Sequence, residues 1–242
     1  MRSHRKTAGR RSLWGCGLYL AAVLCAAVLS NGPATAHGML AQANIWALET
    51  ILRPMIVRNP DIVARQDELL NDPASPVGGN PDGDVTLVEF FDYQCPYCKT
   101  IFPSIQALLA EDRNLRYVFK EFPILGKESV FAARAALAAR RQGKYLEFHT
   151  ALMPARGKLT ETRVMRLAEK VGLDVDRLRR DMADGTVDAT IRRNLELADG
   201  LGIFSTPVFI IGDTQIPGAV EIDTLKVLIA RARQRGTSGK VR

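Results

Sequence analysis

The sequence predicts an α/β fold, because runs typical of buried strands alternate with runs typical of helices. Residues 85–91, Val-Thr-Leu-Val-Glu-Phe-Phe, are almost continuously apolar, as in a central strand that is covered on both faces. A helix is expected from Pro96 to about Ala110, and a second strand over 115–122. A strand, a helix and a second strand in this order form a parallel unit with a right-handed crossover.

The pattern after the second strand is mainly helical and ends with a strand pair and a last helix. Gly, Asp and Thr residues at the ends of the periodic apolar stretches mark the element boundaries. The expected elements are helices at 131–140, 145–153 and 160–171, helices from about 174 and 186, strands at 208–213 and near Ile216, and a helix at 223–234.

Residues 1–36 have the features of a secretory signal peptide. Five basic residues and no acidic residue precede an apolar stretch at 18–29, and Ala-Thr-Ala at 34–36 provides a small-x-small cleavage site. An uncleaved membrane anchor is the alternative, since the stretch 13–30 is nearly long enough to span a bilayer. We expect export to the periplasm or another extracytoplasmic compartment.

The net charge depends on this segment. The whole chain has 33 Lys and Arg residues against 26 Asp and Glu residues, a formal net charge of +7. Without residues 1–36, 28 basic residues face the same 26 acidic residues, and the net charge falls to +2. Nucleic-acid binding favours a strongly basic surface, so no nucleic-acid partner is expected.

The remaining chain is divided into three segments. Residues 37–72 are expected to form an N-terminal helical segment, because apolar residues recur near helical spacing and two prolines interrupt them. The stretch 73–84 is rich in Pro, Gly, Asn and Asp and is expected to be a linker. Residues 85–242 are expected to form one large domain, with a helical insertion at about 126–201.

The motif Cys95-Pro96-Tyr97-Cys98 follows the predicted central strand and begins the next helix. Two cysteines three positions apart in a helical turn lie on one face and can form or break a disulfide. Proline suits the first helical position, because its missing N–H would have no intrahelical partner there. Cys95 is then the N-cap residue, where the N–H groups of the first turn and the helix dipole favour a thiolate. The motif indicates thiol–disulfide exchange.

The cysteine count supports this interpretation. The chain has 4 cysteines, and two of them lie in the predicted signal peptide, so the mature protein keeps only Cys95 and Cys98. In the oxidising surroundings of exported proteins, such a pair is more often a disulfide than a metal site. A static structural disulfide is one alternative. Metal binding is another: with only His37 and His149 as further soft donors, a closed zinc site is disfavoured, while a copper(I) dithiolate stays open. No metal or cofactor is expected.

With these motifs, the sequence resembles the exported DsbA-like thiol-disulfide oxidoreductases of the thioredoxin superfamily over nearly the whole mature chain. The resemblance implies a thioredoxin fold with an inserted helical subdomain and an N-terminal helical extension. It implies that Cys95 is an exposed nucleophile and Cys98 its buried partner. The N-terminal segment and the Gly- and Asp-rich stretch 79–84 resemble the ScsC-type branch, in which some members associate through their N-terminal segment. The resemblance therefore implies that this protein can form a homo-oligomer through its N-terminal helices.

The resemblance also assigns the loop that contacts the substrate. Thr206-Pro207 matches the cis-proline loop of the family, which packs against the disulfide and receives substrate backbone. An ordinary trans proline at a strand edge is the alternative. Thr206, Pro207, Pro96 and Tyr97 are the residues expected to bind substrate. The Pro96-Tyr97 pair also tunes the redox potential, but it occurs in both oxidising and reducing relatives.

Glu89, six residues before Cys95, matches a buried acid of the family. A buried carboxyl must be protonated or paired, and it could take the proton of Cys98 during exchange. Arg116 and Lys120, on one face of the next strand, are the candidate charge partners, and the sequence does not decide between them. The alternative is that Glu89 points to solvent.

Four other residues are interpreted as packing residues. His149 is expected to be a packed helix residue, and three methionines are expected to fill the core. The methionines are Met153, Met165 and Met182.

Three functions remain under consideration. The first is a dithiol oxidase that forms disulfides in reduced or misoxidised exported proteins and is reoxidised by a membrane redox partner. The second is an oligomeric disulfide isomerase or reductase that a membrane donor keeps reduced. The third is a copper-binding or chaperone-like protein whose cysteines bind rather than react.

Overall fold

The structure is a computed structural model, and it describes residues 57–236. The predicted signal peptide, residues 1–36, and the first part of the predicted N-terminal helical segment, residues 37–56, lie outside the described residues.

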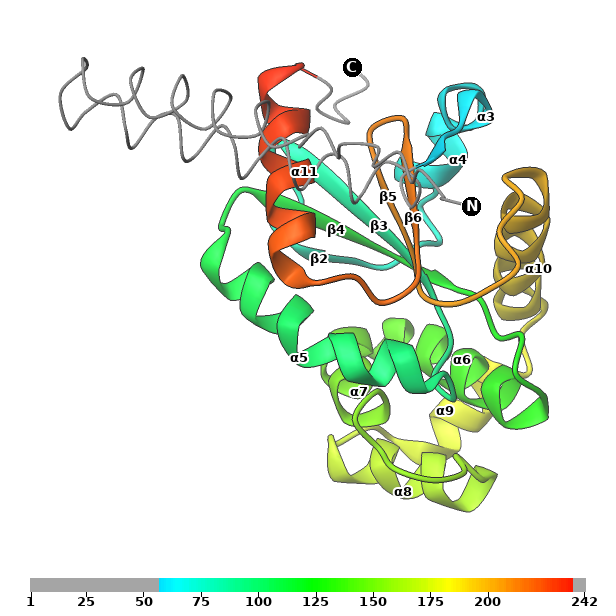
Figure 1. The fold of residues 1–242 in the computed structure, drawn as a ribbon. Helices are drawn as coiled ribbons and strands as arrows, with labels where there is room; N and C mark the ends of the chain where they lie inside the picture. Colours follow the sequence, from blue (N-terminus) through cyan, green and yellow to red (C-terminus); the bar gives the residue numbers. More distant parts are fainter. Residues whose placement is uncertain (1–56, 237–242) are drawn as a thin grey trace, which may run out of the picture. The chain divides into compact units, whose positions relative to one another are not determined.

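A mixed six-stranded sheet lies at the centre of the described domain, in the order β1-β6-β5-β3-β4-β2 (Figure 1). The central strand β3 pairs in parallel with β4 and antiparallel with β5, so the predicted strand–helix–strand unit and the returning strand pair are confirmed. The strands are β1 Val57–Arg58, β2 Val77–Gly79, β3 Val85–Phe91, β4 Leu115–Glu121, β5 Val208–Ile211 and β6 Thr214–Pro217.

The described helices fall into four groups in the chain, the last of which is α11 alone, after β6. Two short helices precede β2, α5 connects β3 to β4, and a run of helices between β4 and β5 forms the predicted insertion, most of it gathered beyond one end of the sheet (Figure 1). The helices are α3 Pro60–Ala64, α4 Gln66–Leu70, α5 Pro96–Glu111, α6 Lys127–Ala139, α7 Tyr145–Leu152, α8 Glu161–Lys170, α9 Val175–Met182, α10 Gly185–Gly200 and α11 Ile222–Gln234, with a 3₁₀ turn at Arg140–Gln142. None of the helices within residues 57–236 has the length and apolar content needed to cross a bilayer.

Two edge strands lie where no strand was predicted. β2 lies within the stretch 73–84, expected to be a linker, and pairs antiparallel with β4. β1 lies within the segment expected to be helical and pairs with β6. The glycines that suggested a linker instead allow close backbone contact: a Cβ on Gly83 would lie 2.5 Å from the carbonyl oxygen of Asn114.

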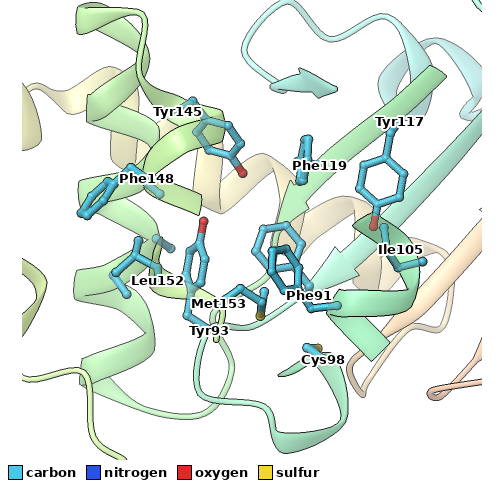
Figure 2. Packing of buried hydrophobic residues seen from close by; sticks show 14 of the residues in the cluster. Phe91, Tyr93, Cys98, Ile105, Tyr117, Phe119, Tyr145, Phe148, Leu152 and Met153 are labelled. Carbon is cyan, nitrogen blue, oxygen red and sulfur yellow. The ribbon is translucent and has the colours of Figure 1, made fainter. Parts of the chain in front are cut away.

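The alternation of side chains along the strands gives the sheet two apolar cores. One face packs on α5, α11 and the helical insertion, and it contains both cysteines and the three methionines predicted to be buried. Figure 2 shows part of this core, in which Phe91 and Phe119 lie beside Tyr93 and Tyr145. The opposite face packs on α3, α4 and the end of α10, with Val88, Phe90, Val118 and Ile210 among its members. The site described next lies on the first face.

Candidate active site

The helix α5 begins at the cysteine motif as the sequence predicted. Cys95 is the N-cap residue, with extended backbone angles of φ −69° and ψ 120°, and Pro96 occupies the first turn. The Cys95 Sγ accepts a hydrogen bond from the Cys98 N–H at 3.5 Å. Both cysteines are free thiols, so this structure is the dithiol form.

The surroundings of Cys95 favour its thiolate. The pKa of Cys95 is lowered from 9.0 to about 6, first by a hydrogen bond from the Cys98 thiol and further by Thr206 and by the N–H groups of Cys98 and Tyr97, while burial opposes this shift. At pH 7 most Cys95 side chains are therefore ionised, whereas a free cysteine would be almost entirely a thiol.

Cys98 has the opposite chemistry. Burial is the main cause that raises the pKa of Cys98 far above its ordinary value, and the hydrogen bond to Cys95 and the negative charge of Glu89 add to it. One cysteine is thus a thiolate and the other a protonated thiol at neutral pH. Such a pair has a defined nucleophile and a defined second thiol.

Cys95 is less accessible than the resemblance implied. Only 3% of Cys95 is exposed, so the expectation of an exposed nucleophile is wrong for this dithiol form. Its Sγ lies 3.2 Å from the carbonyl oxygen of Thr206, in the loop before β5, and this loop covers the sulfur. The apolar side chains of Tyr97 and Phe204, which flank the motif and the loop in sequence, are 65% and 74% exposed.

The loop before β5 has the geometry that the resemblance implied. The Thr206–Pro207 peptide bond is cis, and the Pro207 carbonyl accepts a hydrogen bond from the Gly218 N–H at 2.8 Å. The structure therefore places Thr206 beside the Cys95–Cys98 pair, although Thr206 lies 111 positions after Cys95 in the chain.

Glu89 is buried on β3 and does not point to solvent. Burial raises the pKa of Glu89 from 4.5 to about 8; a hydrogen bond from the Tyr117 hydroxyl to Oε2 opposes this shift, and the negative charge of Cys95 adds to it. The charge of Glu89 acts on Cys98, and a carboxyl with this pKa has the proton affinity that a general acid or base needs near neutral pH.

Neither predicted charge partner of Glu89 is correct. Glu89 pairs with Phe119 across the β3–β4 ladder, so its side chain lies on the face that carries Tyr117. Arg116 and Lys120 lie on the opposite face, because alternate residues of a strand point to opposite sides. Their nitrogens donate to backbone carbonyls of α4, at 2.8 Å and 2.7 Å respectively.

Replacing Glu89 with glutamine is expected to slow the resolution of mixed disulfides by Cys98 about tenfold. Glutamine keeps an acceptor for the Tyr117 hydroxyl but cannot take up the Cys98 proton, and the loss lies below the usual range for a general base because water provides a slower route. The lifetime of a mixed disulfide with a small thiol, followed at pH 8, measures this step. An unchanged lifetime would contradict the proton-transfer role of Glu89.

Sequence reasoning did not identify the residues that fix the loop between β3 and α5. Asp92 Oδ1 accepts hydrogen bonds from the Gln94 N–H and the Ser129 hydroxyl, each at 2.7 Å, and Oδ2 accepts one from the Leu125 N–H at 2.9 Å. The bond from the Gln94 N–H to the Asp92 side chain forms an Asx turn. An aspartate directly after a predicted strand is typical of such a turn and could have indicated this one.

A second tie joins the first turn of α5 to the end of α7. Lys99 Nζ donates hydrogen bonds to the carbonyls of Met153 and Ala155 at 2.9 Å and 2.8 Å. Burial lowers the pKa of Lys99. Together with Asp92, these contacts fix the cysteine motif against the helical insertion.

Within residues 57–236, no group of three or more His, Cys, Asp and Glu side chains is arranged to hold a metal ion. His149 is buried and packs against aromatic rings, as predicted for a packed helix residue.

Residues 86–230 match the DSBA-like thioredoxin domain. The chain belongs to this family. A thioredoxin-like oxidoreductase from Silicibacter pomeroyi has a similar structure, with a TM-score of 0.68 and 53% identity over 69% of this chain and 97% of that chain. The DSBA-like domain is also similar to the thiol-disulfide exchange protein alpha-DsbA2 from Wolbachia pipientis, with a TM-score of 0.67 and 30% identity over 70% of this chain and 92% of that chain.

Two further relatives extend beyond the DSBA-like domain. Proteus mirabilis ScsC has a TM-score of 0.68 and 27% identity, and the match covers 90% of this chain and 96% of that chain. Among curated relatives, a Na(+)/H(+) antiporter NhaA from Salinispora tropica is 31% identical over 83% of this chain. The chain spans only 30% of the length of that antiporter. The similarity therefore concerns one part of that antiporter and not its whole length.

Proposed function

We propose that this DSBA-like protein is an exported thiol-disulfide oxidoreductase that forms disulfide bonds in secreted or periplasmic proteins. The observation that carries the proposal is the opposite chemistry of the two thiols at the start of α5, a thiolate at Cys95 and a protonated thiol at Cys98. A stabilised thiolate favours the reduced enzyme, and its disulfide is correspondingly a strong oxidant.

The reaction begins with the disulfide form. A substrate thiolate attacks the Cys95 sulfur. A bond forms between the substrate sulfur and Cys95, the Cys95–Cys98 disulfide breaks, and Cys98 leaves as a thiolate. Cys98 then takes a proton, which the neutral carboxyl of Glu89 supplies and regains from water. A second substrate thiolate attacks the substrate sulfur of the mixed disulfide, and Cys95 leaves as the stabilised thiolate. The substrate is oxidised by two electrons, and the enzyme is reduced by two.

Substrate binding is assigned to the surface around the covered sulfur. Thr206 and Pro207 provide backbone beside Cys95, and Pro96 and Tyr97 provide the exposed rim of the motif. An incoming chain must displace the contact between Cys95 and the Thr206 carbonyl, and this carbonyl is then free to accept a hydrogen bond from substrate backbone. A membrane redox partner would reoxidise the dithiol.

An oligomeric isomerase or reductase is the second candidate. The similarity to Proteus mirabilis ScsC covers 90% of this chain and therefore includes part of the segment before the domain. In this version, the part of the N-terminal segment before β1, residues 37–56, associates subunits, and a membrane donor keeps the cysteines reduced. Residues 57–72 belong to the domain, since β1 pairs with β6 and α3 and α4 pack on the sheet. The mass of the mature protein in solution, with and without residues 37–56, tests the association.

The deciding experiment compares two substrates. The purified mature protein is mixed in its disulfide form with reduced ribonuclease, and in its dithiol form with scrambled ribonuclease, and recovered ribonuclease activity is followed. An oxidase acts faster in the first reaction and an isomerase in the second. The reduction potential of the Cys95–Cys98 pair, measured against glutathione, provides an independent criterion. Failure in both reactions would reject both candidates.

A further inference from the structure

A second buried acid lies beneath the active-site loop and is not used in the reaction described above. Glu121, the last residue of β4, is 1% exposed. Its Oε1 accepts hydrogen bonds from the hydroxyl of Tyr93 at 3.0 Å and from the hydroxyl of Tyr145 at 2.8 Å. Figure 2 shows these two hydroxyl groups pointing toward each other. The other oxygen, Oε2, is buried and has no hydrogen-bond partner in the part of the chain that the structure describes.

The Tyr93 hydroxyl connects this carboxyl to a histidine. It lies 2.9 Å from Nδ1 of His149, on α7. Burial lowers the pKa of His149 to about 3, so the imidazole is neutral at pH 7. The imidazole, the phenol and the carboxyl form one continuous hydrogen-bonded chain from α7, through the loop that precedes Cys95, to β4. The rings around His149 are Phe91, Tyr93, Phe102, Phe119 and Tyr145.

Glu121 has no positively charged partner among residues 57–236. It forms no salt bridge there, and the largest charge effects on it come from two acids, Asp92 in the loop and Glu89 on β3. α10 contributes only the Asn194 amide, which donates to the backbone carbonyl of Glu121 at 3.1 Å. Burial, followed by these two acids, raises the pKa of Glu121 well above its ordinary value, against the hydrogen bonds from the two tyrosines.

The unpaired oxygen also distinguishes the two charge states. In an ionised carboxylate, Oε2 would carry about half of the negative charge. Burying that charge without a hydrogen-bond donor costs free energy. In a neutral acid with its proton on Oε1, Oε2 is a carbonyl-type oxygen, and leaving it unpaired costs much less. The contacts of Glu121 therefore fit the neutral acid.

We propose that Glu121 is a protonated acid at neutral pH, and that Glu121, Tyr93 and His149 form a second buried proton site linked to the Cys95–Cys98 dithiol. When Glu121 is neutral, its Oε1–H donates to the Tyr93 oxygen, and the Tyr93 hydroxyl donates to Nδ1 of His149. When it is ionised, Nδ1–H donates to the Tyr93 oxygen, the Tyr93 hydroxyl donates to Oε1, and the neutral imidazole has released to water the proton that it carried on Nε2. The two arrangements differ by one proton and require no movement of heavy atoms.

The link to the cysteines rests on the proposed function. Reduction of the disulfide creates a thiolate on Cys95, two residues after Tyr93 and on the same side of the sheet as Glu89. Each negative charge added to this buried region makes the next acid harder to ionise. The dithiol protein should therefore bind the Glu121 proton more tightly than the disulfide protein does.

The protonation of Glu121 can be observed directly by infrared spectroscopy. At pH 7 the full-length mature protein should show carbonyl stretches of buried carboxylic acids, because Glu89 is also largely neutral there. Glu121→Gln should remove one band, and this band should persist in Glu89→Gln. Tyr145→Phe is the matched control, because it removes one neutral donor and leaves the acid and its link to Tyr93, so the band should shift and persist. If Glu121→Gln removes no such band, the proposal is overturned.

A second measurement needs no variant. Carbon-13 NMR of side-chain carboxyls in the unsubstituted protein gives the proton affinity of Glu121, and we expect it to be at least about threefold higher in the dithiol than in the disulfide form, a difference of about half a pKa unit. An ionised Glu121 at pH 7, or equal affinities in the two forms, would refute the proposal. Neither measurement involves a substrate, so failure of the ribonuclease reactions would reject the proposed function and leave this result standing.

Discussion

Replacement of Cys95 with serine is expected to reduce disulfide exchange by at least about a thousandfold. The hydroxyl of serine is not ionised at neutral pH and cannot form a mixed disulfide, so the first bond of the reaction is lost. The fold should persist, because serine is one of the preferred N-cap residues and keeps an oxygen acceptor for the Cys98 N–H. Oxidation of reduced ribonuclease measures the loss, and circular dichroism with thermal unfolding verifies the fold.

Cys98→Ala is the matched variant for this experiment. It keeps the attacking sulfur of Cys95 and removes the thiol that resolves a stalled complex, so mixed disulfides with substrate should accumulate and be visible on non-reducing gels. It also removes the hydrogen bond that contributes most to lowering the pKa of Cys95. Exchange activity in Cys95→Ser close to that of the unsubstituted protein would show that the motif is a structural disulfide or a binding site.

The sequence was most informative where function depends on local geometry. The position of Cys95 at the start of α5 follows from the spacing of the motif and from Pro96, because helix capping depends on neighbouring residues. The central strand β3 was predicted at its observed bounds, because a buried strand has a continuous apolar pattern.

Predictions that depended on tertiary contacts were less successful. The partner of Glu89 depends on the register of β4, and the sequence alone did not place Tyr117 opposite the same face. The resemblance placed the Thr206 loop at the disulfide, 111 positions after Cys95, but it did not predict that Cys95 would be only 3% exposed beside this loop. The cluster at Glu121 joins a loop, a strand and a helix, and no spacing in the sequence connects these residues.

The stability of the dithiol form should rise with pH in a way that depends on Cys95. The pKa of Cys95 is about 6 in the folded protein, lowered from 9.0. A group whose pKa is lowered by folding contributes its full stabilisation above the unfolded pKa and loses it as the pH falls through the folded pKa. The contribution should thus be small at pH 5, at most about 1.4 kcal/mol at pH 7, and largest at pH 9 and above.

The upper limit at high pH is about 4 kcal/mol, and we expect about 2 to 3 kcal/mol because solvent near the active-site opening weakens the interactions of the thiolate. Unfolding by guanidinium chloride under reducing conditions at several pH values gives the free energy of unfolding. Other buried groups also change stability with pH; burial raises the pKa of Glu89, for example. The relevant quantity is therefore the difference between the unsubstituted protein and Cys95→Ser, in which such contributions largely cancel.

This difference should grow with pH only if the thiolate is stabilised by the fold. Cys98→Ala provides a graded test, because it removes the largest of the stabilising hydrogen bonds and leaves the N–H groups of Tyr97 and Cys98 in place. Its free energy of unfolding should rise less steeply between pH 6 and 9 than that of the unsubstituted protein. A difference between the unsubstituted protein and Cys95→Ser that stays constant across this range would mean that Cys95 titrates like an ordinary cysteine, and the strong oxidising power inferred from its thiolate would then have no physical basis.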